Sequence, residues 1–302
     1  MDKMVVGSAN PMDINTDLVR RLIDRQFPQW QRYPIQKIAP GGWDNRSFRL
    51  GSDLTVRLPS HSTYVAQVAK EQRWLPQLAS RLAMAIPMPV AMGLPSDDYP
   101  WPWSVYRWID GETARVAPIA NLPRFATDLA NFLKTLQAID AAEGPLPGSH
   151  NFYRGGDLHV YHNETHNAIQ SLNTCIDQAA ATAVWQAALH KPFSDRPVWV
   201  HGDIASTNLL VQDSRLSAVI DFGCLGIGDP ACDLTIAWTF FSGPSREAFR
   251  RHLEADAGTW ARARGWAIWK ALITMADART DVPKRQEAQR VFNEVITEFA
   301  QR

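Results

Sequence analysis

The fold of this chain is decided by the stretch VHGDIASTNLL (residues 200–210), which a polar turn separates from LSAVIDFG (residues 216–223). The apolar runs on either side of the turn predict a β-hairpin. Asp203 and Asn208 precede the first strand and Asp221 follows the second, so the hairpin brings three oxygen-bearing side chains together. Two carboxylates and a carboxamide suit a hard cation such as Mg²⁺, which prefers oxygen ligands and keeps substrate phosphates in its shell.

One of these carboxylates can instead face an incoming hydroxyl group. A bound cation beside such a carboxylate is typical of phosphoryl transfer, in which positioning and charge neutralisation supply most of the catalysis. A simpler interpretation exists for each residue alone, because a single Asp in a loop is usually a turn or cap residue. The three residues in this order and spacing favour the chemical interpretation.

Around this stretch the chain divides into a strand-rich first part and a helix-rich second part. Periodic apolar residues and turn signals predict the elements. In the first part we expect helices over 13–27 and 63–82, and strands over 36–39, 46–50, 54–58 and 103–109. In the second part we expect helices over 122–138 and 162–189, a β-rich insert over 198–222, and helices from 233 onward. The predicted domains are residues 1–110 and 111–302.

The ordered motifs of the second part resemble those of the aminoglycoside phosphotransferase family of antibiotic and small-molecule kinases, distant relatives of protein kinases. His201, Asp203 and Asn208 match the catalytic loop, and Asp221-Phe222-Gly223 matches the magnesium motif. The segment after it is matched by Asp229-Pro230 and Asp233-Leu234. The resemblance implies an α+β, bilobal protein-kinase-like fold, with a small β-rich N-lobe for the nucleotide and a larger, mainly helical C-lobe for catalysis and the acceptor.

The same resemblance implies roles for individual residues. Asp203 is the expected catalytic base, which accepts or orients the proton of the acceptor hydroxyl. Asn208 and Asp221 are the expected ligands of one or two Mg²⁺ ions. His201 is expected to brace the loop, and Asp233 either ties down its backbone or caps the helix that follows.

A glycine pair in the first part could hold the phosphates of a nucleotide. Gly41 and Gly42 let the backbone come close to an anion. Asn45 and Ser47 in the strand that follows could donate hydrogen bonds to phosphate oxygens, or could merely complete the turn. An ordinary hairpin turn would have the same sequence, and the three-glycine loop of kinases is not present.

Arg57 occupies the place where the kinase pattern has its phosphate-binding lysine. Arginine keeps the charge and can contact a phosphate through two nitrogens, although its shape differs. Glu71 follows fourteen residues later (71 minus 57), where the family has the glutamate that pairs with the lysine. We therefore expect an Arg57–Glu71 ion pair. In the alternative, Arg57 is a surface strand residue and another cation such as Lys70 takes its place.

The segment 105–111 resembles the hinge between the lobes of kinases, whose backbone bonds the edge of a purine. Tyr106 and Trp108 are therefore assigned to the nucleotide site, with ATP or GTP as the phosphate donor. The tryptophans of this region, Trp101, Trp103 and Trp108, are more often packing residues than base-stacking ones.

Composition limits the remaining classes of function. Lys plus Arg and Asp plus Glu number 31 each, so the net charge is zero, which argues against nucleic acid as a partner. Three cysteines without a framework are typical of a reducing cytosol. No apolar run approaches the ~18 residues of a membrane span, and the first residues do not form a signal peptide. We expect a soluble, cytoplasmic protein whose oligomeric state the sequence leaves open.

The expected acceptor is a small hydroxylated molecule, with an aminoglycoside or a related antibiotic as one candidate. Acidic residues of the second part could hold a polyamine: Asp157, Glu164, Glu254, Asp256, Asp277 and Asp281. Arginines are interspersed with the later ones, a pattern more typical of a solvated helix face. Two alternatives are a catalytically silent kinase-like binding protein and a protein kinase. The second is disfavoured because no activation segment separates Gly223 from Asp229.

Overall fold

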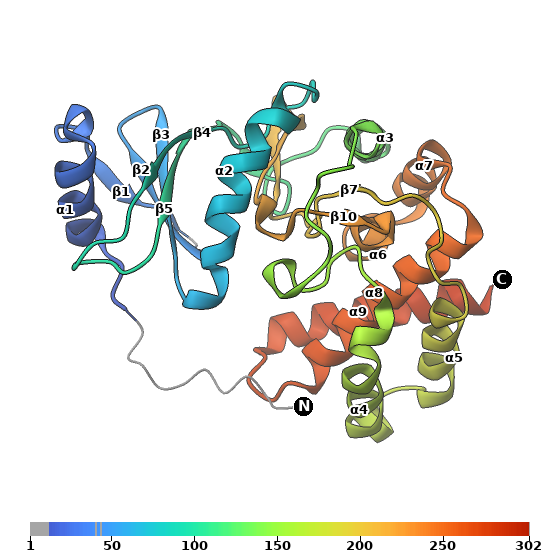
Figure 1. The fold of residues 1–302 in the computed structure, drawn as a ribbon. Helices are drawn as coiled ribbons and strands as arrows, with labels where there is room; N and C mark the ends of the chain where they lie inside the picture. The colour runs from blue at the N-terminus through green and yellow to red at the C-terminus, as the bar shows by residue number, and fades with distance from the viewer. Residues whose placement is uncertain (1–11, 40, 43, 302) are drawn as a thin grey trace. The chain divides into compact units, whose positions relative to one another are not determined.

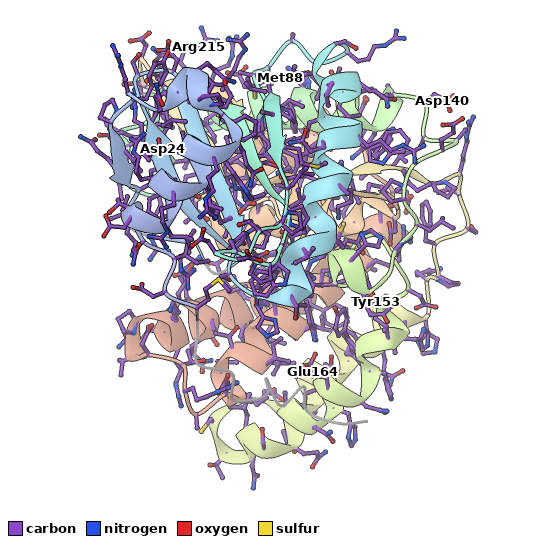
Figure 2. All side chains as sticks on the ribbon, turned by 60° about the vertical axis from the view of Figure 1, so that its left-hand side comes forward. Asp24, Met88, Asp140, Tyr153, Glu164 and Arg215 are labelled. Carbon is purple, nitrogen blue, oxygen red and sulfur yellow. The ribbon has the colours of Figure 1, made fainter. Side chains whose placement is uncertain are left out.

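The computed structural model describes residues 12–39, 41–42 and 44–301, and the chain forms two compact units (Figures 1 and 2). The first unit comprises the chain up to Gln77 together with Pro87–Ile109. The second comprises Leu78–Ile86 and the chain from Asp110 onward. This grouping differs from a division at residue 110 because the Ala85 carbonyl accepts the Val219 N–H at 3.1 Å, which attaches Leu78–Ile86 to the second unit.

The first unit is built on a five-stranded antiparallel sheet in the order β1-β2-β3-β5-β4. Its strands are β1 Ile35–Lys37, β2 Asn45–Leu50, β3 Leu54–Pro59, β4 Pro89–Gly93 and β5 Trp103–Arg107. Its helices are α1 Thr16–Gln26 and α2 Val65–Ala79. Asn15 caps α1 by accepting the Leu18 N–H through its side chain, so the helix begins where the sequence changes from polar to periodic.

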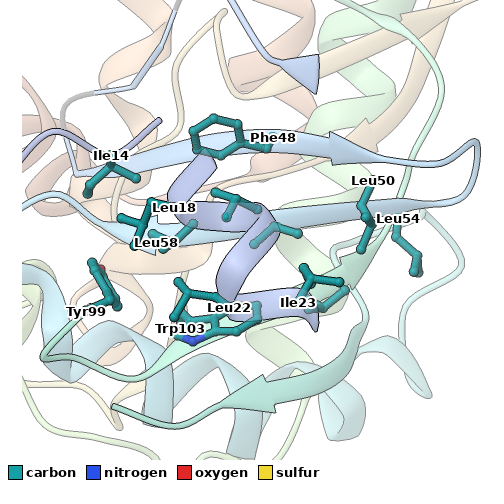
Figure 3. Packing of buried hydrophobic residues seen from close by; sticks show 13 residues of the cluster. Ile14, Leu18, Leu22, Ile23, Phe48, Leu50, Leu54, Leu58, Tyr99 and Trp103 are labelled. Atoms are coloured by element: carbon teal, nitrogen blue, oxygen red, sulfur yellow. The ribbon is translucent and has the colours of Figure 1, made fainter. Parts of the chain in front are cut away.

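Alternation along the strands gives the sheet two different faces. On β3, Leu54, Val56 and Leu58 join the apolar cluster formed with α1 (Figure 3). The intervening Arg57 points to the other face, where it meets Glu71 of α2. Because polar residues alternate with the apolar ones, one face of the sheet holds the core of the unit and the other presents polar groups to α2.

The second unit is mainly helical, with two small sheets. Its strands are β6 Glu112–Thr113, β7 Val198–Val200, β8 Leu209–Gln212, β9 Arg215–Val219 and β10 Gly226–Gly228. β7 pairs with β10, and β6, β8 and β9 form the other sheet. Its helices are α3 Leu122–Ala138, α4 His162–Leu172, α5 Gln178–Leu189, α6 Ile236–Thr239, α7 Gly243–Leu253, α8 Ala257–Ala276 and α9 Val282–Ala300. The largely buried α8 packs against α4, α5 and α9.

The helix expected over 162–189 is wrong as a single element. It is two helices, α4 and α5, because the backbone at Asn173 leaves the helical region (φ 22°) and a short 3-10 turn follows. Asp177 then caps α5 by accepting the Ala180 N–H. Within the described residues no helix has both the length and the apolar character needed to cross a membrane.

Candidate active site

A buried carboxylate holds the backbone of the loop that follows β7. Asp233 lies in the 3-10 turn Pro230–Thr235 and is fully buried. Its two oxygens accept the N–H groups of His201 and Gly202 at 2.8 and 2.7 Å. Burial raises the pKa of Asp233, and the hydrogen bonds from the backbone N–H groups of Gly202 and His201 oppose the rise. Asp233 therefore fixes the loop backbone rather than capping the next helix.

Gly202 is the point at which the loop needs a glycine. Its φ is +83°, in the left-handed region that residues with a Cβ rarely adopt. A Cβ at this position would lie 2.4 Å from the carbonyl oxygen of Cys224. The turn thus brings the backbone of the loop into direct contact with the segment after Asp221.

His201 links the loop to the return strand of the hairpin. Its Nδ1 accepts the Asp203 N–H at 3.2 Å, so the ring hydrogen is on Nε2, which donates to the Ile220 carbonyl at 3.0 Å. The ring also packs against Phe222, with centroids 4.5 Å apart. His201 is thus a brace whose two nitrogens are both occupied by backbone groups.

Asn208 completes the connection between the three predicted residues. Its Nδ2 donates to the backbone oxygen and to Oδ2 of Asp203, at 2.9 and 3.0 Å. The backbone carbonyl of Asn208 accepts the N–H of Ile220, the residue immediately before Asp221, at 2.8 Å. Asn208 is buried and Asp203 is exposed, so a rigid amide supports a carboxylate that solvent or a substrate can reach.

The oxygens of this group fit Mg²⁺. No three His, Cys, Asp or Glu side chains converge on one point in the described part of the chain. Mg²⁺ does not need such a cage, since it is usually held by one or two carboxylates together with water and substrate phosphates. Because Nδ2 of Asn208 is engaged by Asp203, its Oδ1 carries the free acceptor pairs. Asp221, which has a left-handed backbone (φ 68°), would add a carboxylate oxygen.

In the first unit, the polar face of the sheet brings most of the predicted nucleotide-binding residues together. Arg57 Nη1 lies 3.5 Å from Glu71 Oε1, so the expected ion pair is present. Tyr106 donates a hydrogen bond to Glu71, and burial, followed by the charge of Glu71, raises the pKa of Tyr106. Asn45 and Ser47 lie opposite Pro59 and Arg57 across the β2–β3 pair, and alternation places both on the same face as Arg57.

The other predicted residues of the first unit are less closely tied to this group. Gly41 and Gly42 are exposed, and the neighbouring Pro40 and Trp43 lie outside the described residues. The backbone N–H of Trp108 donates to the Asp53 carbonyl at 2.7 Å. The indole of Trp108 packs against Arg49, whose Cζ is 4.0 Å from the ring centroid. Its ring therefore supports a neighbouring cation at the turn after β2.

Sequence reasoning missed a buried ion pair behind the catalytic loop. Arg262 of α8 donates to both carboxylate oxygens of Asp229, at 2.6 and 3.1 Å. Both side chains are more than nine-tenths buried. The motif Asp229-Pro230 is visible in the sequence, but Arg262 is one of several arginines interspersed with acidic residues, a pattern typical of a solvated helix face. The tryptophan, alanine and isoleucine residues within 259–269 indicate a helix with a large apolar surface, but they do not single out Arg262.

The family follows from a comparison of the whole chain with known proteins. Residues 35–266 match the model of the phosphotransferase enzyme family. The chain belongs to this family. Aminoglycoside 3'-phosphotransferases are similar over a short stretch, with 38% identity over 60 residues for one from Escherichia coli and 42% over 57 for one from Salmonella typhimurium. These stretches cover 19% and 18% of this chain and 22% and 21% of the relatives, so the chain spans about a fifth of their length.

Solved structures of phosphotransferases share the fold over nearly the whole chain. The GDP complex of aminoglycoside 2'-phosphotransferase-IIIa has a TM-score of 0.73 at 19% identity, over 94% of this chain and 99% of that one. Macrolide 2'-phosphotransferase from Brachybacterium faecium has a TM-score of 0.62 at 20% identity, over 92% and 98%. The predicted α+β, protein-kinase-like fold and the resemblance to this phosphotransferase family are confirmed.

Proposed function

We propose that this phosphotransferase family member transfers the γ-phosphate of ATP or GTP to a hydroxyl group of a small molecule, with Mg²⁺ as cofactor. The observation that carries the proposal is the double hydrogen bond from Asn208 to Asp203, within a loop whose backbone Asp233 holds. A group fixed in this way loses little entropy when a reactant binds, which is how positioning contributes to catalysis.

Each residue of the loop has a defined task in the proposed reaction. The exposed carboxylate of Asp203 accepts the proton of the acceptor hydroxyl. The hydroxyl oxygen forms a bond to the γ-phosphorus, and the bond between that phosphorus and the β–γ bridging oxygen breaks. Asn208 Oδ1 and the Asp221 carboxylate hold Mg²⁺, which when bound neutralises charge on the phosphates of the nucleotide.

In the first unit, Arg57 is the cation that would bind a phosphate of the nucleotide. Arg57 is held by Glu71, and Glu71 is held in turn by Tyr106, so the guanidinium is fixed on the polar face of the sheet. Relatives support a nucleotide as donor: one solved aminoglycoside phosphotransferase is a GDP complex, and another is a ternary complex with ATP and streptomycin. We propose that Arg57 binds a phosphate where kinases use lysine.

The proposal is tested by replacing Asp203 and leaving the rest of the loop in place. We expect Asp203→Asn to lower transfer of labelled γ-phosphate by about 10²–10⁴-fold, the usual contribution of a general base. Nucleotide binding, followed by calorimetry with Mg²⁺, should remain. Asp213→Asn is the matched control, because Asp213 is an exposed carboxylate in the turn of the same hairpin. The acceptor panel comprises aminoglycosides, macrolides, and neutral and anionic metabolites.

Two outcomes would contradict the proposal. Equal transfer rates for Asp203→Asn and Asp213→Asn would remove Asp203 from the reaction. Tight binding of Mg²⁺–nucleotide without transfer to any acceptor would identify a catalytically silent binding protein. Label that appears in the protein fraction of a cell extract would instead indicate a protein kinase.

A further inference from the structure

Two cationic side chains of the second unit lie beside the catalytic loop, and neither forms an ion pair with a described residue. They are Arg154, in the loop before α4, and Lys270, on α8. In the described part of the chain, neither side chain donates a hydrogen bond or lies within 4.0 Å of a carboxylate. Both lie near the indole of Trp269, with Arg154 Cζ 5.1 Å and Lys270 Nζ 5.8 Å from its centroid.

Arg154 is placed directly against the residue that precedes the proposed base. A Cβ on Gly202 would lie 3.0 Å from the Cβ of Arg154. The guanidinium is also 5.1 Å from the ring of Trp266. Its Nε is buried and has no hydrogen-bond partner within the described chain. A buried donor without a partner is costly, and the terminal nitrogens of the same guanidinium, which are not buried, are the donors that an acceptor from outside can reach.

Three other buried or half-buried arginines of the second unit each have a carboxylate partner. Arg262, Arg264 and Arg246 each contact a carboxylate, at 2.6, 3.2 and 2.7 Å. An arginine is the residue best suited to hold a planar carboxylate or a phosphate through two nitrogens. Among the described residues, a carboxylate contacts each of these three arginines and none contacts Arg154, which leaves the terminal nitrogens of Arg154 for an external anion.

The backbone around Arg154 is strained and firmly held. The preceding Phe152 and Tyr153 both have left-handed backbones (φ 52° and 53°), which non-glycine residues rarely adopt. The Phe152 carbonyl accepts the Tyr161 hydroxyl at 2.6 Å, and the Arg154 carbonyl accepts Nδ2 of Asn151 at 3.1 Å. Strain that is kept in place by such contacts is typical of ligand-binding sites.

Tyr161 and Trp269 form an aromatic pair next to the two cations. Tyr161 stacks on Trp269 with ring centroids 4.0 Å apart, and Trp269 Nε1 donates to Glu164 Oε2 at 2.8 Å. Figure 2 shows Glu164 on α4 and Tyr153 in the preceding loop. Glu164 is thus engaged by an indole, and its carboxylate orients Trp269 while the cations stay available.

Charged groups of both signs surround Lys270. Arg154 repels its ammonium group, and Asp203 and Glu164 attract it. Loss of surrounding water, followed by the repulsion from Arg154, lowers the pKa of Lys270, although the residue keeps exposed surface. A site for a polyamine would need a surplus of carboxylates, whereas here two cations offset two carboxylates.

Four of the six acidic residues that the sequence offered for a polyamine have other partners. Glu254 binds Lys134 at 2.8 Å, and Asp277 binds Arg279 at 2.8 Å. Asp256 and Asp281 cap α8 and α9 by accepting backbone N–H groups. These contacts indicate stabilising roles, whereas the carboxylates that attract Lys270 are Asp203 and Glu164.

We propose that the acceptor of this phosphotransferase carries an anionic group, a carboxylate or a phosphate, in addition to its hydroxyl, and that Arg154 and Lys270 bind that group beside Asp203. This inference rests on the proposed function, since it names the acceptor class of the same site. The oxygens of the anion would accept hydrogen bonds from two nitrogens of Arg154 and from the ammonium group of Lys270. This contact would place the hydroxyl group of the acceptor at the carboxylate of Asp203.

The test uses three probes with one hydroxylated three-carbon skeleton: glycerol, glycerate and glycerol 3-phosphate. Each is titrated into the full chain with Mg²⁺ and ADP in excess, so that the nucleotide site is filled. Shifts of the tryptophan indole N–H resonances report binding beside Trp266 and Trp269. We expect saturable shifts with one or both anions and none with glycerol. Glycerate and glycerol 3-phosphate separate a carboxylate from a phosphate as the preferred anion.

Variants assign the binding to the two cations. Arg154→Met and Lys270→Met should each weaken anion binding at least tenfold and leave ADP binding unchanged, whereas Arg279→Met should change neither. Lys270→Met keeps the test valid if Arg154→Met fails to fold. Equal binding of all three probes, no binding of either anion, or equal loss of ADP binding and anion binding would overturn the inference. Anion binding without phosphate transfer would contradict the proposed function alone.

Discussion

Asp233 Oδ1 accepts the backbone N–H of Gly202 at 2.7 Å, and the second oxygen of the same carboxylate accepts the N–H of His201. One buried side chain therefore sets the position of the backbone that leads to Asp203. It does so from the turn Pro230–Thr235, thirty-one residues later in the chain. The orientation of the proposed base therefore depends on a fully buried residue of another segment.

Replacing this carboxylate should weaken both the fold and the reaction. In Asp233→Asn the amide can accept one N–H, but its NH₂ group would face the other donor. We expect the free energy of unfolding to fall by about 2–3 kcal/mol, the size of a hydrogen bond to a charged group. Urea denaturation measures the loss, and Asp213→Asn is the surface control. A variant with unchanged stability and unchanged transfer would remove Asp233 from its structural role.

Gly202→Ala tests the close approach of the loop to Cys224. The left-handed conformation alone costs a non-glycine residue about 1–2 kcal/mol, and the new Cβ would also meet the Cys224 carbonyl at 2.4 Å. Gly243→Ala is the matched control, because Gly243 has φ +44° and no atom within 4 Å of its missing Cβ. Gly202→Ala should lower the denaturation midpoint further than Gly243→Ala. Equal midpoints would mean that the contact does not restrict this position.

The elements best predicted from the sequence were those with local signals. The bounds predicted for α3, 122–138, agree with the structure, because Asn121 caps the helix and Pro123 fixes its first turn. The hairpin around 212–215 was visible in the same way, since a polar turn separated two apolar strands. These features depend on neighbouring residues, which a single sequence displays.

Features that depend on distant residues were not predictable. The periodic apolar pattern continues from α4 into α5, so it did not mark the break at Asn173. Nothing near Arg154 in the sequence indicated that it would lie against Gly202, because that contact joins segments almost fifty residues apart, or that it would lie over the rings of Trp266 and Trp269. Arg262 was likewise indistinguishable from the surface arginines until its partner Asp229 was placed.

The Asp229–Arg262 pair should be costly to break from either side. Each single change, Asp229→Ala or Arg262→Met, leaves a buried charge without a partner, which costs about 3–5 kcal/mol. The double variant should lose less than the sum of the two, since it leaves no isolated charge. Chemical denaturation of all four proteins gives the coupling energy. The exposed pair Asp277–Arg279 serves as control and should show no coupling; additivity in both pairs would contradict the role of the buried one.

Removal of the proposed magnesium ligand should separate metal binding from folding. In Asp221→Asn the site loses a negative charge but keeps its shape, so Mg²⁺-dependent nucleotide binding should fall at least tenfold while the denaturation midpoint changes little. Calorimetric titrations with ATP, one in the presence of Mg²⁺ and one in the presence of EDTA, measure how nucleotide binding depends on the metal. Wild-type protein should bind more tightly with Mg²⁺ than with EDTA. The same Mg²⁺ dependence in wild type and Asp221→Asn would assign the metal to other residues.

The pKa of Lys270 offers a direct test of the charges that surround the catalytic loop. The ammonium pKa lies below its ordinary value of 10.5, with loss of water as the main cause and repulsion from Arg154 as the second. Arg154→Met removes a like charge and should raise this pKa, whereas Asp203→Asn removes an attractive charge and should lower it further. Titration of ¹³C-methylated lysine resonances by NMR measures both shifts, with Arg279→Met as control.

The same titration predicts how anion binding depends on pH. Lys270 must be protonated to attract an anion, so the affinity for glycerate or glycerol 3-phosphate should weaken as the pH rises through the lowered pKa of Lys270. In Arg154→Met the affinity is weaker throughout, but the pH at which it declines further should move upward with the pKa. A pKa that neither substitution moves, or an affinity that stays constant across this range, would show that Lys270 is not coupled to Arg154 and Asp203.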